Sequence, residues 1–230
     1  MEDIHNNSDA NNKSNDICGL FNKISLNSNS NCGTGAGGKN TNVNGKNYEK
    51  ITSIEDKLNK NGFIKTTFNS NKHYYYEKNN DVKQIIYLTQ YSFKFYFKQY
   101  LNMNISMCPD EAYLTIYTNK NTNGINKYNL KILEKKYQHN SGSVDEKLKT
   151  GKFNENLYKL HIDNEIENKK LLYEFTVSYA FCINNYLKQL LVTNKNKHKY
   201  WYDLIVSDDI KIFYGDDDNY FNLLFEWINF

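Results

Sequence analysis

Alternation of apolar and polar positions predicts most of the strands in this chain. Apolar residues recur at every second position in a series of short segments, the spacing of a strand with one buried face. The longest alternation runs from Val82 to Leu101 without Gly, Pro, Asn or Asp. It predicts one long bent strand, or two strands that meet near Gln90–Ser92. The other predicted strands are Phe63–Phe68, Lys72–Glu77, Tyr113–Thr118, Lys127–Tyr137, Leu157–Ile166, Leu171–Tyr179, Tyr200–Val206 and Ile210–Tyr214.

Apolar residues spaced three and four positions apart predict three helices. The first covers Tyr48–Asn61 and is followed by Gly62, a residue that often caps a helix C-terminus. The second is expected around Ile183 to Leu191, and the third is a closing helix over Tyr220–Phe230. One helix is therefore expected before the strands and two near the end of the chain.

Short polar links join most of the predicted strands, and short links favour antiparallel pairing of neighbours. A sheet of roughly seven to nine strands with aromatic inner faces tends to curl rather than stay flat. We therefore predict an α+β fold: a strongly curved, largely antiparallel sheet or partly open barrel. It would carry one N-terminal and two C-terminal helices.

The N-terminal segment has a different composition from the rest of the chain. Residues 1–47 hold 13 of the 38 Asn but only one of the 35 aromatic residues, Phe21. A segment with so few large apolar groups cannot offset the entropy lost on ordering. We predict a disordered Asn/Gly-rich tail over 1–47 and a single α+β domain over 48–230.

The charged residues exclude several classes of function. All 29 basic residues are Lys, so no bidentate guanidinium contact or arginine finger is possible. A net charge of +3 is not typical of a nucleic-acid binder, and no direct sequence-specific contact with nucleic acid is expected. Residues 1–20 lack the apolar stretch of a secretory signal. The most apolar segment, Leu171–Val192, contains Glu174 and Lys188, so no membrane span is expected.

The glycine run Gly33–Asn40 matches G-x-G-x-x-G and nearly matches the phosphate-loop pattern. Asn40 stands where Ser or Thr would bind magnesium. A phosphate loop also needs a buried strand before it and a helix after it. The flanking residues NSNSNC and NTNVNGKN fit neither element, so we predict a flexible linker and no nucleotide cofactor.

Two polar clusters could bind a metal or move protons. His161 and Asp163 share one face of a predicted strand, where they could act as ligand or general base, but a solvated face is the more typical reading. Asp216–Asp218 could hold Mg²⁺ or Ca²⁺, yet their position before the last helix favours capping. We predict no metal site and no catalytic residue.

Three further groups of residues have functional and structural interpretations. Tyr74–Tyr76 could stack nucleic-acid bases, although a strand edge is favoured. The basic loop Lys195–Lys199 could contact phosphate. The four cysteines are spaced far apart without C-x-x-C, so reduced thiols in the cytosol or nucleus are expected. These four are Cys18, Cys32, Cys108 and Cys182.

The transition at Leu58 to Phe63, where a helix leads into a strand, is similar to two families of curled antiparallel folds. The triphosphate-tunnel enzymes require E-x-E-x-K on an early strand, and residues 63–77 contain no such triplet. The barrel subunits of the Mediator head module, especially subunit twenty, resemble this chain over more segments. The matching segments are Ile86–Thr89 leading to Ser92–Phe93, a helix before Tyr200–Leu204, Ile210–Gly215 and the apolar helix Asn222–Phe230. The region 110–170 departs from that pattern.

This resemblance implies a non-enzymatic subunit of a nuclear multiprotein assembly, a Mediator-like component that bridges regulators and RNA polymerase II. Its partners would be other protein subunits. One alternative is a soluble small-ligand-binding protein or enzyme with its site inside the curved sheet; another is a cytosolic trafficking or ubiquitin-pathway adaptor. Convergent polar groups around a cavity would favour an enzyme, whereas an interior filled by Tyr and Phe would favour the subunit.

The closing helix has a wide apolar stripe, which predicts a role beyond covering the sheet. Leu224 and Trp227 are expected to pack on the domain. Part of Phe221, Ile228 and Phe230 is expected to stay available and bind another subunit.

Overall fold

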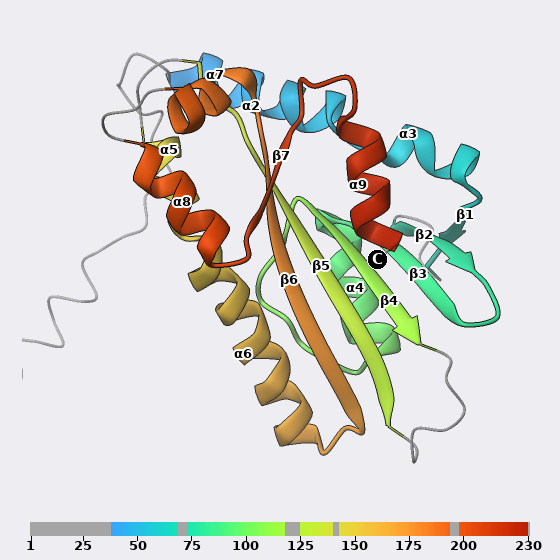
Figure 1. Cartoon of the computed structure of the whole chain (residues 1–230). Coiled ribbons are helices and arrows are strands. Elements are labelled where there is room, and N and C mark those ends of the chain that lie inside the picture. The colour runs from blue at the N-terminus through green and yellow to red at the C-terminus, as the bar shows by residue number, and fades with distance from the viewer. Residues whose placement is uncertain (1–37, 69–72, 118–124, 140–142, 194–197, 230) are drawn as a thin grey trace, which may run out of the picture. The chain divides into compact units, whose positions relative to one another are not determined.

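A mixed sheet of seven strands, in the order β1 to β7, forms the centre of the described part of the chain (Figure 1). The computed structural model describes residues 38–68, 73–117, 125–139, 143–193 and 198–229. Strands β1 and β7 pair on one side only, so the sheet is open and the α+β class is confirmed. The strands are β1 (Ile64–Thr67), β2 (Tyr74–Asn79), β3 (Lys83–Thr89), β4 (Glu111–Tyr117), β5 (Asn126–Lys136), β6 (Tyr173–Ile183) and β7 (Lys211–Tyr214).

The pairing of neighbouring strands changes once across the sheet, from antiparallel to parallel. Strands β1 to β5 pair antiparallel, so the antiparallel pairing predicted for these neighbouring strands, including β1–β2 and β4–β5, is confirmed. The pairs β5–β6 and β6–β7 are parallel. A parallel pair needs a crossover, which here contains a helix in each case. The longest helix of the first crossover is α6 (Gly151–Lys169), and that of the second is α8 (Lys199–Ser207).

The two crossover helices occupy segments for which strands were predicted, so those predictions are wrong. The apolar residues of Leu157–Ile166 alternate in sequence, but Tyr158 and Ile162, four apart, are buried against the sheet. Leu160 is instead exposed on the outer face of α6. Because the exposed Leu160 stands between Tyr158 and Ile162, apolar residues occur at every second position, as they would in a strand. In Tyr200–Val206, Ile205 is buried whereas Tyr200 and Leu204 are exposed.

The long alternation after Val82 is a strand only in its first half. The chain turns at Thr89 into α4 (Gln90–Tyr100), where a strand was predicted. Thr89 and Ser92 form a capping box that satisfies the free amides at the start of the helix. Phe93 and Phe97, four residues apart, then face the core. The prediction of a break near Gln90 is confirmed, but the second element is a helix.

The first predicted helix is interrupted. It consists of α2 (Gly38–Ile51), α3 (Glu55–Leu58) and a 3-10 turn over Asn59–Asn61. Gly62 caps it with φ 82°, as predicted. Helix α2 begins ten residues before Tyr48, so the expectation that the sequence after the glycine run is not helical is wrong; residues 33–37 lie outside the described residues.

The remaining helices lie between β5 and the end of the described chain. They are α5 (Val144–Leu148), α7 (Asn185–Lys188) with a π-helical turn over Gln189–Thr193, and α9 (Tyr220–Asn229). The helix predicted around Ile183 to Leu191 and the closing helix are therefore confirmed. None of the helices described is long and apolar enough to cross a membrane.

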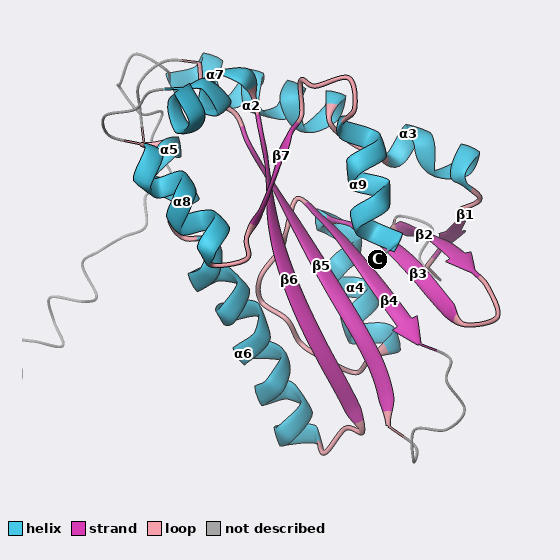
Figure 2. Cartoon of the chain, viewed as in Figure 1, coloured by secondary structure: helices cyan, strands magenta, loops and turns pink. Residues whose placement is uncertain are grey.

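Helices cover both faces of the sheet, which places an aromatic core on each side (Figure 2). Helices α4, α6 and α8 pack on the face that carries Ile86 and Leu88. Helices α2, α3 and α9 pack on the opposite face, which carries Tyr87 and Tyr113. The described sheet is open and helices cover both of its faces, so it does not close into a barrel.

Substitution of Gly215 by Ala is expected to lower the free energy of unfolding by about 2–3 kcal/mol, because overpacking a full core forces neighbours to shift. Gly215 follows β7, and an added Cβ would lie 2.3 Å from Tyr48 Oη and 2.8 Å from Cys182 Sγ. Gly45→Ala is the control, since nothing lies within 4 Å of its added Cβ. Urea denaturation should show the control unchanged or stabilised by up to about 1 kcal/mol. Equal midpoints for the two variants would contradict the packing around Gly215.

Candidate functional site

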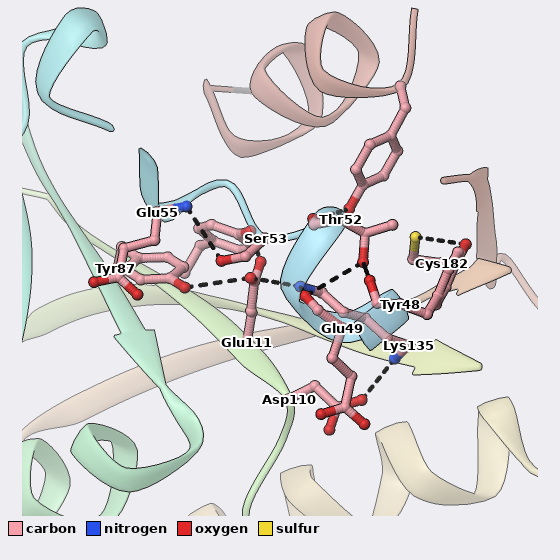
Figure 3. A network of polar contacts seen from close by, with 12 residues as sticks. Tyr48, Glu49, Thr52, Ser53, Glu55, Tyr87, Asp110, Glu111, Lys135 and Cys182 are labelled. Carbon is pink, nitrogen blue, oxygen red and sulfur yellow. Dashed lines mark hydrogen bonds and ion pairs between the residues drawn. The ribbon is translucent and has the colours of Figure 1, made fainter. Parts of the chain in front are cut away.

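A buried ion pair joins β4 to β5 on the face covered by α2 (Figure 3). Glu111 begins β4 and Lys135 lies near the end of β5; their side chains are 3% and 2% exposed. Lys135 Nζ lies 2.7 Å from Glu111 Oε1. Removing two charges from water is costly, so such a pair persists only when further hydrogen bonds satisfy both groups.

Those further hydrogen bonds are present. The Tyr87 hydroxyl donates to Glu111 Oε1 at 3.2 Å, and the Tyr113 hydroxyl donates to Oε2 at 2.6 Å. Lys135 Nζ also donates to the carbonyl oxygen of Glu49 at 2.9 Å. Burial, together with the Glu111 carboxylate, raises the pKa of both tyrosines well above the ordinary value. Both phenols therefore remain hydrogen-bond donors, and the network fastens α2 to the sheet.

Cys182 lies beside this network and is buried. Its thiol is within 3.5 Å of the Tyr48 hydroxyl (Figure 3), and burial raises the pKa of Cys182 to about 11. A thiol with so high a pKa stays protonated at neutral pH. Cys108 is partly exposed and is a free cysteine as well. Cys18 and Cys32 lie outside the described residues.

A pocket of about 420 Å³ opens beside the ion pair, and we call it the carboxylate pocket. Helices α2 and α3 form one wall, and the β3–α4 junction with the start of β4 forms the other. Five carboxylates and three ammonium groups line it. They are Glu49, Glu55, Asp56, Asp110 and Glu111, with Lys46, Lys50 and Lys135.

The charge balance of the carboxylate pocket favours a cation. Lys135 is neutralised by Glu111, which leaves four carboxylates against two lysines. Burial and the negative charge of Asp110, which lies on the opposite wall, raise the pKa of Glu49, because the two carboxylates repel each other. The Glu55 carboxylate accepts hydrogen bonds from Tyr74 at 2.7 Å and Tyr76 at 3.2 Å. A cation bound in the carboxylate pocket would relieve the repulsion between Glu49 and Asp110.

Metal binding does not explain the pocket. Across the described residues, no three or more His, Cys, Asp or Glu side chains come together in a way that could hold a metal ion. The carboxylates are distributed around the walls rather than converging on one point. An extended organic cation, such as an amine or guanidinium group on an alkyl chain, fits this distribution better than a compact ion does.

Structure changes the interpretation of both polar clusters singled out in the sequence. His161 and Asp163 lie on α6, where residues two apart point in different directions, so the predicted shared face is wrong.

Asp216 Oδ2 accepts a hydrogen bond from the Asn185 amide at 2.6 Å, at the start of α7. Asp217 forms an ion pair with Lys188 at 2.7 Å. Capping was the right role, but the capped helix is α7 rather than the closing helix.

Tyr74–Tyr76 lie on β2, which is paired on both sides, so the prediction of a strand edge is wrong. Tyr74 and Tyr76 point toward Glu55, as their hydrogen bonds show. Tyr75 packs on the opposite face against Phe68 and Tyr96. These rings are therefore used by the two cores. Of the basic loop, residues 195–197 lie outside the described residues.

The closing helix packs on the domain as predicted through Leu224, which is buried, and Trp227, which contacts Tyr113 and Phe213. Of the predicted partner-binding residues, Ile228 is 1% exposed and belongs to the core. Phe221 is partly buried beneath the ammonium group of Lys57, and Phe230 lies outside the described residues. A partner contact by Phe221 stays a prediction.

Sequence reasoning missed the carboxylate pocket, although one signal was present. Glu111 and Lys135 are charged residues within apolar strand patterns, and each occupies a position on the same face as a core residue two places away, Tyr113 and Leu133. A charge on a core face is unusual and points to a buried partner.

Three comparisons with known proteins complete the description of the site. No protein-family model, no curated protein and no solved structure matches this chain. The function therefore has to be inferred from the geometry and charge of the site.

Proposed function

We propose that this protein is a non-enzymatic binding subunit that holds a partner protein through the carboxylate pocket. The observation that carries the proposal is the excess of carboxylates in a pocket of about 420 Å³ whose buried lysine is already paired. Such a pocket complements a Lys or Arg side chain of a partner, because the charged head meets carboxylates and the alkyl stem meets the walls.

Tyrosines add a second element of recognition. Tyr91 lies at the pocket and is 73% exposed, whereas Tyr87 is buried at its inner wall. An aromatic ring beside carboxylates strengthens the binding of a cation through the negative face of its π-system. An exposed Tyr beside an acidic hollow is also typical of protein-binding surfaces, in which Tyr is enriched.

The hydrogen bonds among the buried polar side chains beside the carboxylate pocket support binding rather than catalysis. General acid–base catalysis needs a group that titrates near the working pH and reaches the substrate. Here Glu111, Lys135, Tyr87 and Tyr113 are hydrogen-bonded to one another, and both phenols have a pKa well above the ordinary value because of burial. Tyr and Phe also fill both faces of the sheet, and this is the arrangement that we expected for a subunit rather than for an enzyme.

A narrower form of the proposal is a nuclear subunit similar to the Mediator head barrels. Its support is the sequence order at Leu58–Phe63 and the apolar closing helix. One of the segments quoted for the resemblance, Tyr200–Leu204, is helical here. Strong curvature of the sheet, protein partners that bridge regulators and RNA polymerase II, and a location in the nucleus rather than the cytoplasm all belong to this narrower proposal.

A second candidate function, binding of a small organic amine, is favoured by the volume of the carboxylate pocket. About 420 Å³ lies within the range of small-molecule sites, so a complete small amine would fit. The carboxylates would then bind a free ligand rather than a partner's side chain.

The proposed function can be tested by NMR titration of the full chain with N-acetyl-lysinamide and N-acetyl-argininamide. Saturable shifts of amides in α2 and α3 are expected at millimolar ligand, with no such shifts for the uncharged N-acetyl-norleucinamide. In the double variant Glu49→Gln/Asp56→Asn, affinity should fall about tenfold or more, since each lost ion pair in a partly buried site is worth roughly 1 kcal/mol. The matched control is Asp163→Asn/Glu167→Gln, which removes two exposed carboxylates of α6.

Affinity purification from native cells then distinguishes the two candidate functions. Proteins that are retained by the wild type and by the α6 control, but lost from Glu49→Gln/Asp56→Asn, would support the subunit. Tight binding of spermidine with an unchanged set of co-purified proteins would support the amine-binding alternative. Equal binding of the lysine and norleucine probes would refute a cation site of either kind.

A further inference from the structure

A second pocket, of about 280 Å³, lies on the other face of the sheet, and we call it the Glu134 pocket. Glu134 and Lys136 reach it from the end of β5, and Tyr179 reaches it from β6. Asn154 and Tyr158 of α6, Lys147 of α5 and Thr150 between these two helices also line it. None of these side chains lines the carboxylate pocket, although Asp110 of that pocket is a neighbour of Glu134.

Positive charge prevails among the side chains that line this pocket. Lys136 Nζ lies 2.9 Å from Glu134 Oε2, and both side chains are largely withdrawn from solvent. The ammonium group of Lys147 takes part in none of the ion pairs found in the described ranges. Two lysines therefore line the pocket with one carboxylate, Glu134, whose nearest acidic neighbour is Asp110, and Lys147 has no acidic partner among the described residues.

Neutral hydrogen-bond donors surround the lysines. The Asn154 side-chain amide donates to the Tyr179 hydroxyl at 3.3 Å and to the Thr150 hydroxyl at 3.2 Å. Burial, followed by the charge of Glu134, raises the pKa of Tyr158 and of Tyr179 above the ordinary range. Both phenols therefore keep their protons at neutral pH and can donate hydrogen bonds into the pocket.

We propose that the Glu134 pocket binds a small oxyanion, a carboxylate, phosphate or sulfate group, between Lys136 and Lys147. The phenol donors of Tyr158 and Tyr179 would complete its coordination. Glu134 acts as an internal competitor, because it occupies Lys136 when the pocket is empty. A volume of about 280 Å³ admits an oxyanion with a few attached carbon atoms, and it lies at the small end of ligand sites.

Protonation of Glu134 makes this binding dependent on pH. Burial and the neighbouring Asp110 raise the pKa of Glu134 to about 7, against the lowering effect of Lys136. The other titratable groups that line the same pocket are Tyr158 on α6, Tyr179 on β6, Lys147 on α5 and Cys108 before β4. As the pH falls through 7, Glu134 takes up a proton, its negative charge is lost and Lys136 is released. Oxyanion affinity should therefore rise as the pH falls.

Sulfate is the suitable probe, because its charge stays constant between pH 6 and pH 8. Calorimetric titration of the full chain should give a dissociation constant several-fold to tenfold lower at pH 6 than at pH 8; tenfold corresponds to about 1.4 kcal/mol. Glu134→Gln should bind sulfate at pH 8 as tightly as the wild type does at pH 6, with little remaining pH dependence. Lys147→Met should weaken binding about tenfold at either pH.

Two controls separate this site from general attraction to lysines and from the proposed function. Lys127→Met removes a lysine from the far end of β5, where it forms an exposed pair with Glu174, and should bind sulfate as the wild type does. Glu49→Gln/Asp56→Asn should also keep sulfate binding, whether or not the carboxylate pocket binds a cation. Acetate and inorganic phosphate, titrated at pH 6, identify which oxyanion is preferred.

The proposal is overturned if sulfate binding is not saturable, or if Lys147→Met binds as tightly as the wild type. It is equally overturned if Glu134→Gln keeps the full pH dependence of the wild type. Thermal midpoints of the variants, measured at both pH values, ensure that the binding data are collected on folded protein.

Discussion

Replacing Lys135 by Met is expected to lower the free energy of unfolding by about 3–5 kcal/mol, because removing one partner of a buried ion pair leaves an uncompensated buried charge. Glu111 would keep the phenol donors of Tyr87 and Tyr113 but lose its only cation at 2.7 Å among the described residues. The lost bond to the Glu49 carbonyl would also loosen α2. Urea denaturation monitored by far-UV circular dichroism measures the change.

A double-mutant cycle identifies charge as the cause. The variant Glu111→Gln/Lys135→Met keeps an acceptor for the two tyrosines and removes both charges, so it should be less destabilised than Lys135→Met alone. We expect a coupling energy of about 2 kcal/mol or more, within the range found for residues of one network. Lys127→Met, at a pair whose side chains are about half exposed, should change stability by less than about 1 kcal/mol. Additive single changes would show that the pair contributes no coupling.

The ion pair between Glu111 and Lys135 also forms the inner wall of the carboxylate pocket. The same two residues therefore affect both the stability of the fold and the shape of the pocket. Glu111 and Lys135 are neutralised by each other, while the outer carboxylates, including Glu49 and Asp56, have no buried cation of this kind in the described chain. Substitutions at the outer carboxylates can therefore test binding without breaking the network. Substitutions at the inner pair test the fold.

Sequence predicted those elements whose patterns follow from local geometry. The strands of the pairs β1–β2 and β4–β5 follow each other in sequence with short links, which favour the antiparallel pairing that is observed. Gly62 lies at φ 82°, a conformation that Gly adopts without strain. The closing helix has apolar residues three and four positions apart, and this spacing places them on one side of a helix.

The helices of the crossovers could not be predicted from periodicity, because apolar residues also occur on their outer faces. In α6, Phe153 and Leu160 are exposed although apolar, so the sequence reads as an alternating strand. Once α6 and α8 are assigned as strands, short links imply antiparallel pairing throughout. The parallel pairing of β5, β6 and β7 depends on these two helices, and this single error changed the predicted topology.

The carboxylate pocket was beyond sequence reasoning for a different reason. Glu111 and Lys135 are 24 residues apart, and only the β4–β5 register, in which Glu111 faces Leu133, brings them together. Glu49 and Glu55 come from α2 and α3, whose placement on that face depends on the packing of Tyr48 and Ile54. Composition could show the charges but not their convergence.

Helix α4 gives the sharpest test of the fold, because the two interpretations of its sequence place different residues in the core. In a strand, Tyr91, Phe93, Phe95 and Phe97 would share one buried face. In α4, Phe97 is completely buried and contacts Phe93 at a ring distance of 4.5 Å, whereas Tyr91 is exposed. Phe97→Ala is therefore expected to lower the free energy of unfolding by about 3–5 kcal/mol, the usual cost of truncating a buried Phe.

Tyr91→Ala is the matched control, and it should change the free energy of unfolding by no more than about 0.5 kcal/mol, as exposed substitutions do. Because Tyr91 lines the carboxylate pocket, the same variant should weaken binding of N-acetyl-lysinamide while leaving the denaturation midpoint unchanged. Comparable destabilisation by Tyr91→Ala and Phe97→Ala would restore the strand and would remove Tyr91 from the surface. An unchanged midpoint together with unchanged lysine binding would keep the helix but exclude the aromatic contribution to the pocket.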